Sequence, residues 1–242
     1  MNYILEVKNY LADQLSCNIE DFEKEDIQFV RNSKQKKPFL KICTMGKSVI
    51  VSASPSLFPK VEMLLQGKTR DEIFENPFIY GQSIFYIPDH GGLKSSFLPQ
   101  DFQYKLMQGE EMKDLVSIKG FENSLGFDDN GNTPTGSVFF AVKDDEIVGM
   151  AGASCESETM WELGVDVKPQ WRNQGLATAL INTLGTILLE QEKLPFYCAS
   201  TTNIASQAVA IRSGFIPCWV STYGTILDGS SVYQDVIKKL EL

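Results

Sequence analysis

Histidine and paired cysteines are scarce in this chain, and their scarcity excludes several kinds of chemistry. The one histidine, His90, stands beside two glycines in a loop-like stretch, so a multi-histidine metal site is excluded. The cysteines are odd in number, widely spaced and never arranged as CxxC, which argues against a zinc ribbon and a disulfide scaffold; they are Cys17, Cys43, Cys155, Cys198 and Cys218. The sequence therefore predicts reduced thiols and no metal.

Long apolar runs and nucleotide-binding glycine patterns are absent too. No run approaches the ~20 residues of a membrane span, and residues 1–14 carry charges throughout, with no apolar signal core. Neither G-x-x-x-x-G-K-S/T nor G-x-G-x-x-G occurs, which excludes a Walker loop and a dinucleotide fingerprint. We therefore expect a cytoplasmic protein with no membrane partner.

Positive charge is deficient in one part of the chain only. Residues 1–100 hold 12 acidic and 12 basic side chains, so the whole formal net charge of −9 falls in residues 101–242. An acidic region repels nucleic acid and anionic lipid at long range and attracts cations such as amines. We expect no nucleic-acid partner.

The chain divides where this charge balance changes. Its 242 residues suit one large domain or two small ones, and the stretch 88–96 is rich in Pro, Gly and Ser, which interrupt regular structure. The sequence predicts an N-terminal α+β domain at residues 1–88, a linker at 89–100 and a second domain at 101–242.

The predicted N-terminal domain has helical and hairpin patterns. Apolar spacing predicts helices over 3–15 and 56–66, two apolar runs in 39–53 predict a hairpin, and Thr69 with Glu72 forms a capping box that opens another short helix. An aromatic stretch follows, whose side chains either build the core or line a pocket; they are Phe78, Tyr80, Phe85 and Tyr86.

The second domain alternates strands with helices. The patterns predict strands over 102–107, 137–142, 147–153, 160–167, 194–200, 215–222 and 232–238. They predict helices over 109–118, 121–125, 173–191 and 204–213, the third with Leu176, Leu180, Leu184 and Leu188 on one stripe. This order indicates a mixed sheet with helices packed on it.

One strand–turn–helix segment has the pattern of an anion site. A strand ends at Val167, Pro169 ends its pairing, and a long helix begins near Asn173. Free amides and the positive end of the helix would then converge where Arg172 adds charge, which suits a pyrophosphate. The alternative is an ordinary strand–helix connection with a solvated arginine.

The segment resembles the GNAT superfamily of acyl-CoA-dependent N-acyltransferases, whose motif V-x-P-x-x-R/Q-x-x-G-x-G/A it matches from Val167 to Ala177. A second block follows at the family's distance, from Asn203 through Ser206 to Gly214-Phe215. The resemblance covers about 140 residues and is closest to bacterial members with an extra N-terminal domain. It implies an α/β (α+β) fold: a mixed, mostly antiparallel sheet flanked by helices, beside a smaller α+β domain.

The resemblance also implies where acetyl-CoA, the expected co-substrate, would bind. Amides at the helix start would hold the pyrophosphate, the strand before it would pair with the pantetheine arm, and the third and fourth strands of the domain would splay apart to admit that arm. The residues so implied are Val165, Asp166, Val167, Arg172, Asn173, Gln174, Gly175, Leu176, Ala177, Thr178, Ser200, Asn203 and Ser206.

The acceptor amine must lose a proton before it attacks a thioester. Glu162 is the candidate base, and Asp166, on the same face of a regular strand, is the reserve; a hydrogen-bonded structural role for Glu162 is the alternative. Where many family members have a tyrosine as general acid, this chain has Ala210. Either Tyr197 or Tyr223 substitutes, or the thiolate leaves unaided.

Two functions follow from the resemblance. The first is an N-acetyltransferase that acts on a small-molecule or peptide amine by direct attack on the thioester. The second is a non-catalytic acyl-CoA-binding module, which Ala210 favours. The sequence leaves open a homodimer. We expect residues 1–88 to pack beside the acceptor entrance, since a linker of about eight residues spans only ~15–17 Å; a remote dimerisation domain is the alternative.

Overall fold

The structure is a computed structural model that describes residues 1–93, 97–225 and 227. The chain forms two compact units, each built from two stretches that are distant in sequence. The first unit contains Met1–Glu6 and Tyr86–Pro217, and the second contains Val7–Phe85 and the described residues from Cys218 onward. The predicted domain boundaries differ from these contact-based bounds and stay a prediction.

The first unit is built on a sheet of strand order β4-β9-β8-β7-β6-β5. Pairing is antiparallel from β5 through β8 and parallel between β8 and β9. The strands are β4 (Ile79–Pro88), β5 (Gln103–Gln108), β6 (Thr135–Lys143), β7 (Glu146–Cys155), β8 (Met160–Val167) and β9 (Leu194–Ser200). The expectation of a mixed, mostly antiparallel sheet flanked by helices is confirmed.

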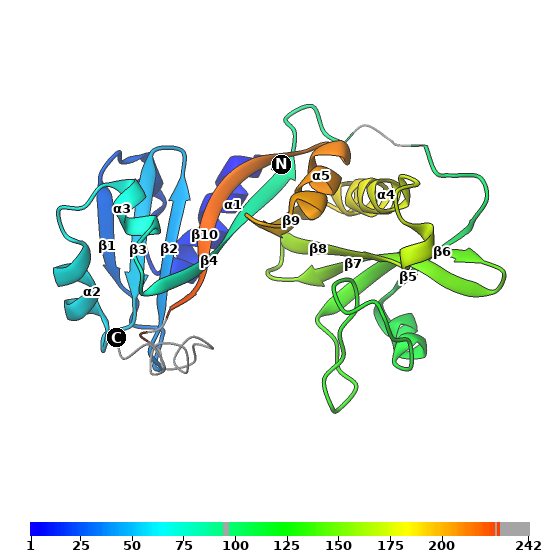
Figure 1. The fold of residues 1–242 in the computed structure, drawn as a ribbon, viewed down its shortest axis with the longest axis horizontal. Helices are drawn as coiled ribbons and strands as arrows, with labels where there is room; N and C mark the ends of the chain where they lie inside the picture. Colours follow the sequence, from blue (N-terminus) through cyan, green and yellow to red (C-terminus); the bar gives the residue numbers. More distant parts are fainter. Residues whose placement is uncertain (94–96, 226, 228–242) are drawn as a thin grey trace. The chain divides into compact units, whose positions relative to one another are not determined.

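Different elements cover the two faces of this sheet (Figure 1). On one face lie α4 (Leu176–Glu190) and α5 (Ile204–Arg212), and the predicted leucine stripe of α4 is buried from Leu176 to Leu188. On the other face, the 3-10 segment η2 (Gly109–Leu115) and the residues after it form a core with the sheet. Phe121, Leu125 and Met150 belong to this second core.

Three predicted helices differ from the structure. Residues 109–118 contain the short 3-10 segment η2, and residues 121–125 form a turn. The long helix begins at Leu176, later than predicted, because Asn173 and Gly175 have positive φ angles of 61° and 78° that an α-helix does not allow. The 3-10 turn η3 (Pro169–Trp171) precedes them.

The second unit is built on a sheet of order β1-β3-β2-β10-β4, with β1 (Ile27–Arg31), β2 (Leu40–Met45), β3 (Ser48–Ala53) and β10 (Phe215–Thr225). The β2–β3 hairpin is confirmed and turns at Gly46, whose φ is 60°. The sequence patterns missed β1 and β4. The predicted strand over 232–238 lies outside the described residues.

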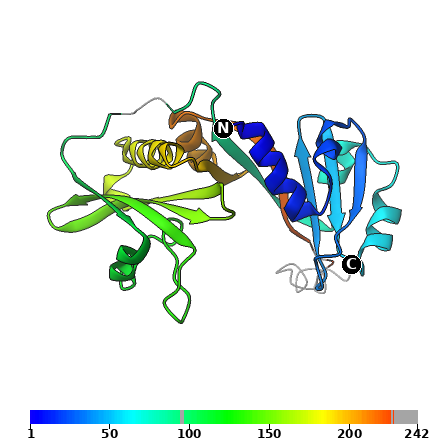
Figure 2. The ribbon, with the colours of Figure 1, turned by 180° about the vertical axis from the view of Figure 1, so that it is seen from behind.

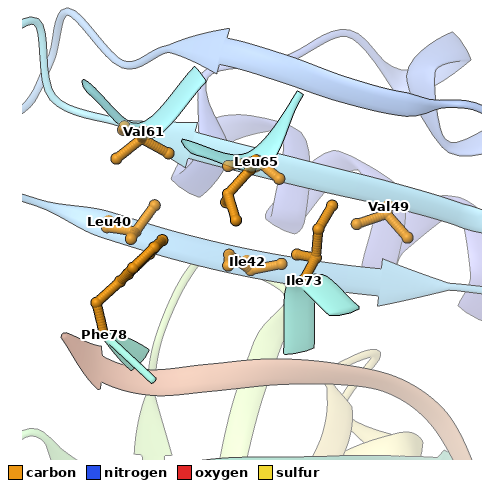
Figure 3. Close-up of a cluster of buried hydrophobic side chains, with 9 residues drawn as sticks. Leu40, Ile42, Val49, Val61, Leu65, Ile73 and Phe78 are labelled. Carbon is orange, nitrogen blue, oxygen red and sulfur yellow. The ribbon is translucent and has the colours of Figure 1, made fainter. Parts of the chain in front are cut away.

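Helices cover both faces of the second sheet. Figure 2 shows α1 (Tyr3–Leu15) on one face, with η1 (Ile19–Glu23) following it. On the other face α2 (Phe58–Leu65) and α3 (Arg70–Phe74) bury Val61, Leu65 and Ile73 against β2 and β3 (Figure 3). The capping box that opens α3 is present as predicted: the Glu72 amide donates to Thr69, and the Thr69 amide donates to the Glu72 carboxylate.

The aromatic stretch near β4 packs within the protein. Phe78 joins the core of the second unit, and Tyr86 is buried. Phe85 stacks on Trp219 with ring centroids 4.7 Å apart. These contacts favour the core interpretation over the pocket interpretation. None of the helices in the described part of the chain combines the length and the apolarity that a membrane span requires.

Candidate functional site

A cleft opens in the first unit where two parallel strands stop pairing. β8 and β9 pair from Met160↔Leu194 to Leu163↔Tyr197 and no further, although β8 continues to Val167 and β9 to Ser200. The cleft that lies there has a volume of about 880 Å³. The free edge of β8 beyond Leu163 can pair with an extended ligand, as an added strand would.

The predicted position of this splay is wrong by one strand. The third and fourth strands of the predicted domain, β7 and β8, pair without interruption from Gly149↔Val167 to Cys155↔Trp161. The fourth and fifth, β8 and β9, separate instead. The parallel pair β8–β9 diverges toward its carboxyl ends, whereas the antiparallel pairing of β7 and β8 extends along β8 from Trp161 to Val167.

The N-terminus of α4 supplies an anion-binding end to the cleft. Its first helical hydrogen bond runs from the Ala179 amide to the Gly175 carbonyl, so the amides just before Ala179 have no acceptor inside the helix. Apart from Gly175 itself and its two chain neighbours, no described residue has an atom within 4 Å of where a Cβ on Gly175 would stand. The Arg172 side chain donates through Nε to the Val167 carbonyl at 2.8 Å, which fixes the turn to the end of β8.

Nearly all of the predicted cofactor residues line this one cleft. They are Val165, Asp166, Val167, Arg172, Asn173, Gly175, Leu176, Ala177, Thr178, Ser200, Asn203 and Ser206. Gln174 is exposed and does not line it. Asn203 also has a structural role, because its side chain caps α5 by accepting from the Ser206 amide at 3.1 Å.

Several cleft residues were missed by the sequence patterns. Arg212, in the last turn of α5, faces the cleft together with Arg172, so two cations line it. Asn123 and Ser154 line it as well, the first from the turn after η2 and the second from β7 opposite Glu162. Arg212 could have been found from its place on the helix that Asn203 opens; Asn123 gave no signal in the sequence.

The two candidate bases lie on one face of β8, as predicted. β8 pairs regularly with β7, so Glu162, Gly164 and Asp166 point to the same side. Both carboxylates line the cleft. The Asp166 carboxylate accepts four hydrogen bonds, from the amides of Asn123 and Ser124 and from both of their side chains. These four bonds occupy the Asp166 carboxylate and hold the turn that contains Asn123 and Ser124.

The tyrosines differ in their surroundings. Tyr197 is buried and lines the cleft, where its hydroxyl shares a 2.9 Å hydrogen bond with the Ser206 hydroxyl. Burial raises the pKa of Tyr197 above its ordinary value, so the hydroxyl stays protonated at neutral pH. Tyr223 belongs to the second unit, is 80% exposed and lies beside Tyr80. Ala210 is buried and is not part of the cleft lining.

The mixed sheet opens between two parallel strands, and the N-terminus of α4, preceded by Gly175, lines the opening. Residues 105–215 match the model of the acetyltransferase (GNAT) family, so this part of the chain is a GNAT acetyltransferase domain. This family takes acetyl groups from acetyl-CoA, so the fold supports acyl transfer from that co-substrate.

Two solved structures are among those that the chain matches. A GNAT-family protein from Novosphingobium aromaticivorans is 18% identical, with a TM-score of 0.46 over 71% of this chain and 81% of its own. A GCN5-related N-acetyltransferase-like protein from Streptococcus suis is 16% identical, with a TM-score of 0.49 over 81% of this chain and 87% of its own. No curated protein matches the chain.

Proposed function

We propose that this protein transfers the acetyl group of acetyl-CoA to an amine by direct attack of the amine on the thioester. The observation that carries the proposal is the joining, in one cleft, of an unpaired β8 edge, a free helix N-terminus and a carboxylate on β8. An acyltransferase needs these three features to hold the arm, hold the phosphates and remove a proton.

The residues of the cleft fit acetyl-CoA. The space at Gly175 lets a phosphate approach the backbone, and Arg172 and Arg212 bring two positive charges to this lining. The free edge of β8 from Gly164 to Val167 matches the amides of a pantetheine arm. When bound, acetyl-CoA supplies a thioester, whose carbonyl carbon is open to a nucleophile.

Glu162 accepts the proton of the attacking amine. An alkylamine has a pKa near 10, so at neutral pH it is protonated and needs a base or a water relay to free its electron pair. The nitrogen then forms a bond to the carbonyl carbon, and the carbon–sulfur bond breaks with its electron pair on sulfur. Asp166 is not needed as the base, because the Asn123–Ser124 turn occupies it.

The leaving thiolate can be protonated within the cleft. Because Ala210 has no hydroxyl, we assign this role to Tyr197, whose hydroxyl is paired with that of Ser206. A thiol of pKa near 8.5 also leaves as the thiolate without an acid. We therefore expect Tyr197 to matter much less than Glu162.

Thiol release from acetyl-CoA tests the proposal. The full chain is assayed with a panel of small amines and lysine peptides, and acetyl-CoA affinity is measured by calorimetry on the same protein. Turnover with at least one amine supports acetyl transfer. Tight acetyl-CoA binding with no amine-dependent thiol release would instead indicate a non-catalytic acyl-CoA-binding module, and absence of binding would overturn both functions.

A further inference from the structure

Two glycines on the Glu162 side of the sheet are covered by a single turn of the chain. Gly152 of β7 and Gly164 of β8 are direct neighbours across the two strands. A Cβ on Gly164 would stand 1.8 Å from the Asn123 carbonyl oxygen, and one on Gly152 would stand 1.6 Å from that of Ser124. The two missing side chains therefore make the seat on which the turn lies.

The turn is fixed at both ends and in the middle. Phe121 and Leu125 are buried in the core on this face of the sheet. Between them, Asp166 Oδ2 accepts from the Asn123 amide at 2.9 Å, from the Ser124 amide at 2.9 Å and from the Ser124 hydroxyl at 2.8 Å. A segment held in this way gives the cleft a rigid wall.

Asp166 also decides how the Asn123 side chain is oriented. Asn123 Nδ2 donates to Asp166 Oδ1 at 2.6 Å. The opposite orientation would place the amide oxygen against a carboxylate oxygen, so it is excluded by repulsion. The Asn123 oxygen consequently accepts from no residue in the described part of the chain, and Asn123 lines the same cleft as Glu162.

Charge is divided within the cleft lining. Among the described lining residues, the carboxylates are Glu162 and Asp166, on the face that carries the turn, and the cations are Arg172 and Arg212, in the segment before α4 and at the end of α5. The negatively charged phosphates of the co-substrate would bind near the two arginines. The carboxylate face therefore suits an acceptor with positive charge and disfavours one with a carboxylate next to its amine.

We infer that Asn123 binds the acceptor amine, that Asp166 is a positioning residue acting through Asn123, and that the acceptor is a cationic amine without a neighbouring carboxylate. The inference rests on the proposed function. The Asn123 oxygen accepts one N–H of the amine, and Glu162 takes the proton that the attack releases. Two oxygen acceptors on one rigid wall orient the nitrogen toward the thioester.

Asn123→Ala tests the binding role, because it removes the side-chain oxygen and leaves the backbone bond to Asp166. Loss of one such hydrogen bond should raise KM for the amine about 3- to 10-fold, with acetyl-CoA affinity unchanged by calorimetry. Gly126→Ala is the matched control: it lies in the same segment, and no atom stands within 4 Å of its Cβ position. It should leave both values unchanged. An unchanged amine KM in Asn123→Ala overturns the inference.

Asp166→Asn tests positioning separately from folding. If Asp166 acts through Asn123, Asp166→Asn raises the amine KM in the wild-type background but adds little in the Asn123→Ala background. A purely structural role would give equal effects in both backgrounds, which would refute positioning. Acetyl-CoA affinity and thermal unfolding report whether either variant has lost the fold.

A pair of acceptors that match in shape and differ in charge tests the substrate class. Glutamine amide carries neutral amides where glutamate carries carboxylates, and spermidine extends the cationic series. We expect thiol release with spermidine and glutamine amide to exceed that with glutamate at least tenfold in kcat/KM. Equal rates, or release with glutamate alone, would overturn the inference while supporting acetyl transfer. Failure to bind acetyl-CoA, or binding without turnover of any amine, would defeat the proposed function itself and the inference with it.

Discussion

The two ends of the cleft use glycine for opposite reasons. Gly175, at the start of α4, has a φ of 78° and open space where a side chain would be. Gly164, on β8, has that space filled by the Asn123 carbonyl oxygen. The first glycine leaves room for a ligand, and the second leaves room for another part of the protein. Changing Gly175 should therefore affect binding, and changing Gly164 should affect the fold.

The largest expected effect is on chemistry at the Gly164 end. Glu162→Gln removes the proposed base but keeps the size of the side chain, so we expect turnover to fall by roughly 10²–10⁴. Acetyl-CoA affinity should stay at the wild-type value because the pyrophosphate end is untouched. Steady-state thiol release and calorimetry on one preparation measure both. Turnover equal to wild type across pH would remove Glu162 from the mechanism.

Gly164→Ala tests the contrast between Gly164 and Gly175 through the free energy of unfolding. The added methyl group meets the backbone carbonyl of Asn123, a residue whose amide donates to Asp166, so the turn has to move. Overpacking of this kind costs about 1–3 kcal/mol of the free energy of unfolding, which a denaturant titration resolves. Gly126→Ala, with open space around it, is the control and should change stability by less than about 0.5 kcal/mol. Equal stability of both variants would contradict the conclusion that the turn packs directly on Gly164.

Gly175→Asp should show the reverse pattern, with binding lost and the fold kept. A carboxylate placed against a pyrophosphate should weaken acetyl-CoA binding by at least ~2 kcal/mol, or about 30-fold. Gly175→Asn is the matched control, since asparagine has the same shape and equally tolerates a left-handed backbone but has no charge. Calorimetry with each folded variant compares them. Unchanged affinity in Gly175→Asp would refute the pyrophosphate site.

The smallest expected effect is at the proposed proton donor. Tyr197→Phe removes the hydroxyl that pairs with Ser206, yet the thiolate can leave unaided, so turnover should fall less than tenfold. Tyr223→Phe should do less still, because that side chain is exposed in the second unit. A loss for Tyr197→Phe as large as that for Glu162→Gln would mean that the leaving thiolate requires an acid.

The anion-binding end of the cleft was predictable from sequence because its parts are neighbours along the chain. The residues from Val167 to Ala177 carry the strand end, the proline and the glycine within one turn and one helix start. The structure places the predicted residues there on one cleft, apart from Gln174. The exact start of α4 was missed, since periodicity alone does not reveal the positive φ of Asn173.

The turn at residues 121–125, which lies on Gly152 and Gly164, could not be predicted in the same way. Residues 121–125 have apolar spacing that suggests a short helix, but the bonds that shape them come from Asp166, more than forty positions along the chain. Asp166 was read from strand alternation as a reserve base, and alternation did put it on the correct face. It gave no information on which groups would donate to that carboxylate.

The sequence by itself therefore determined most of the elements and the turn between β8 and α4, because hydrophobic period, caps and glycine angles act over a few residues. Only the tertiary structure decided where the sheet splits, which turn lies on Gly152 and Gly164, and what Asp166 holds. Those outcomes depend on which distant groups meet across strands and loops, and a single sequence does not encode such pairings in any local pattern.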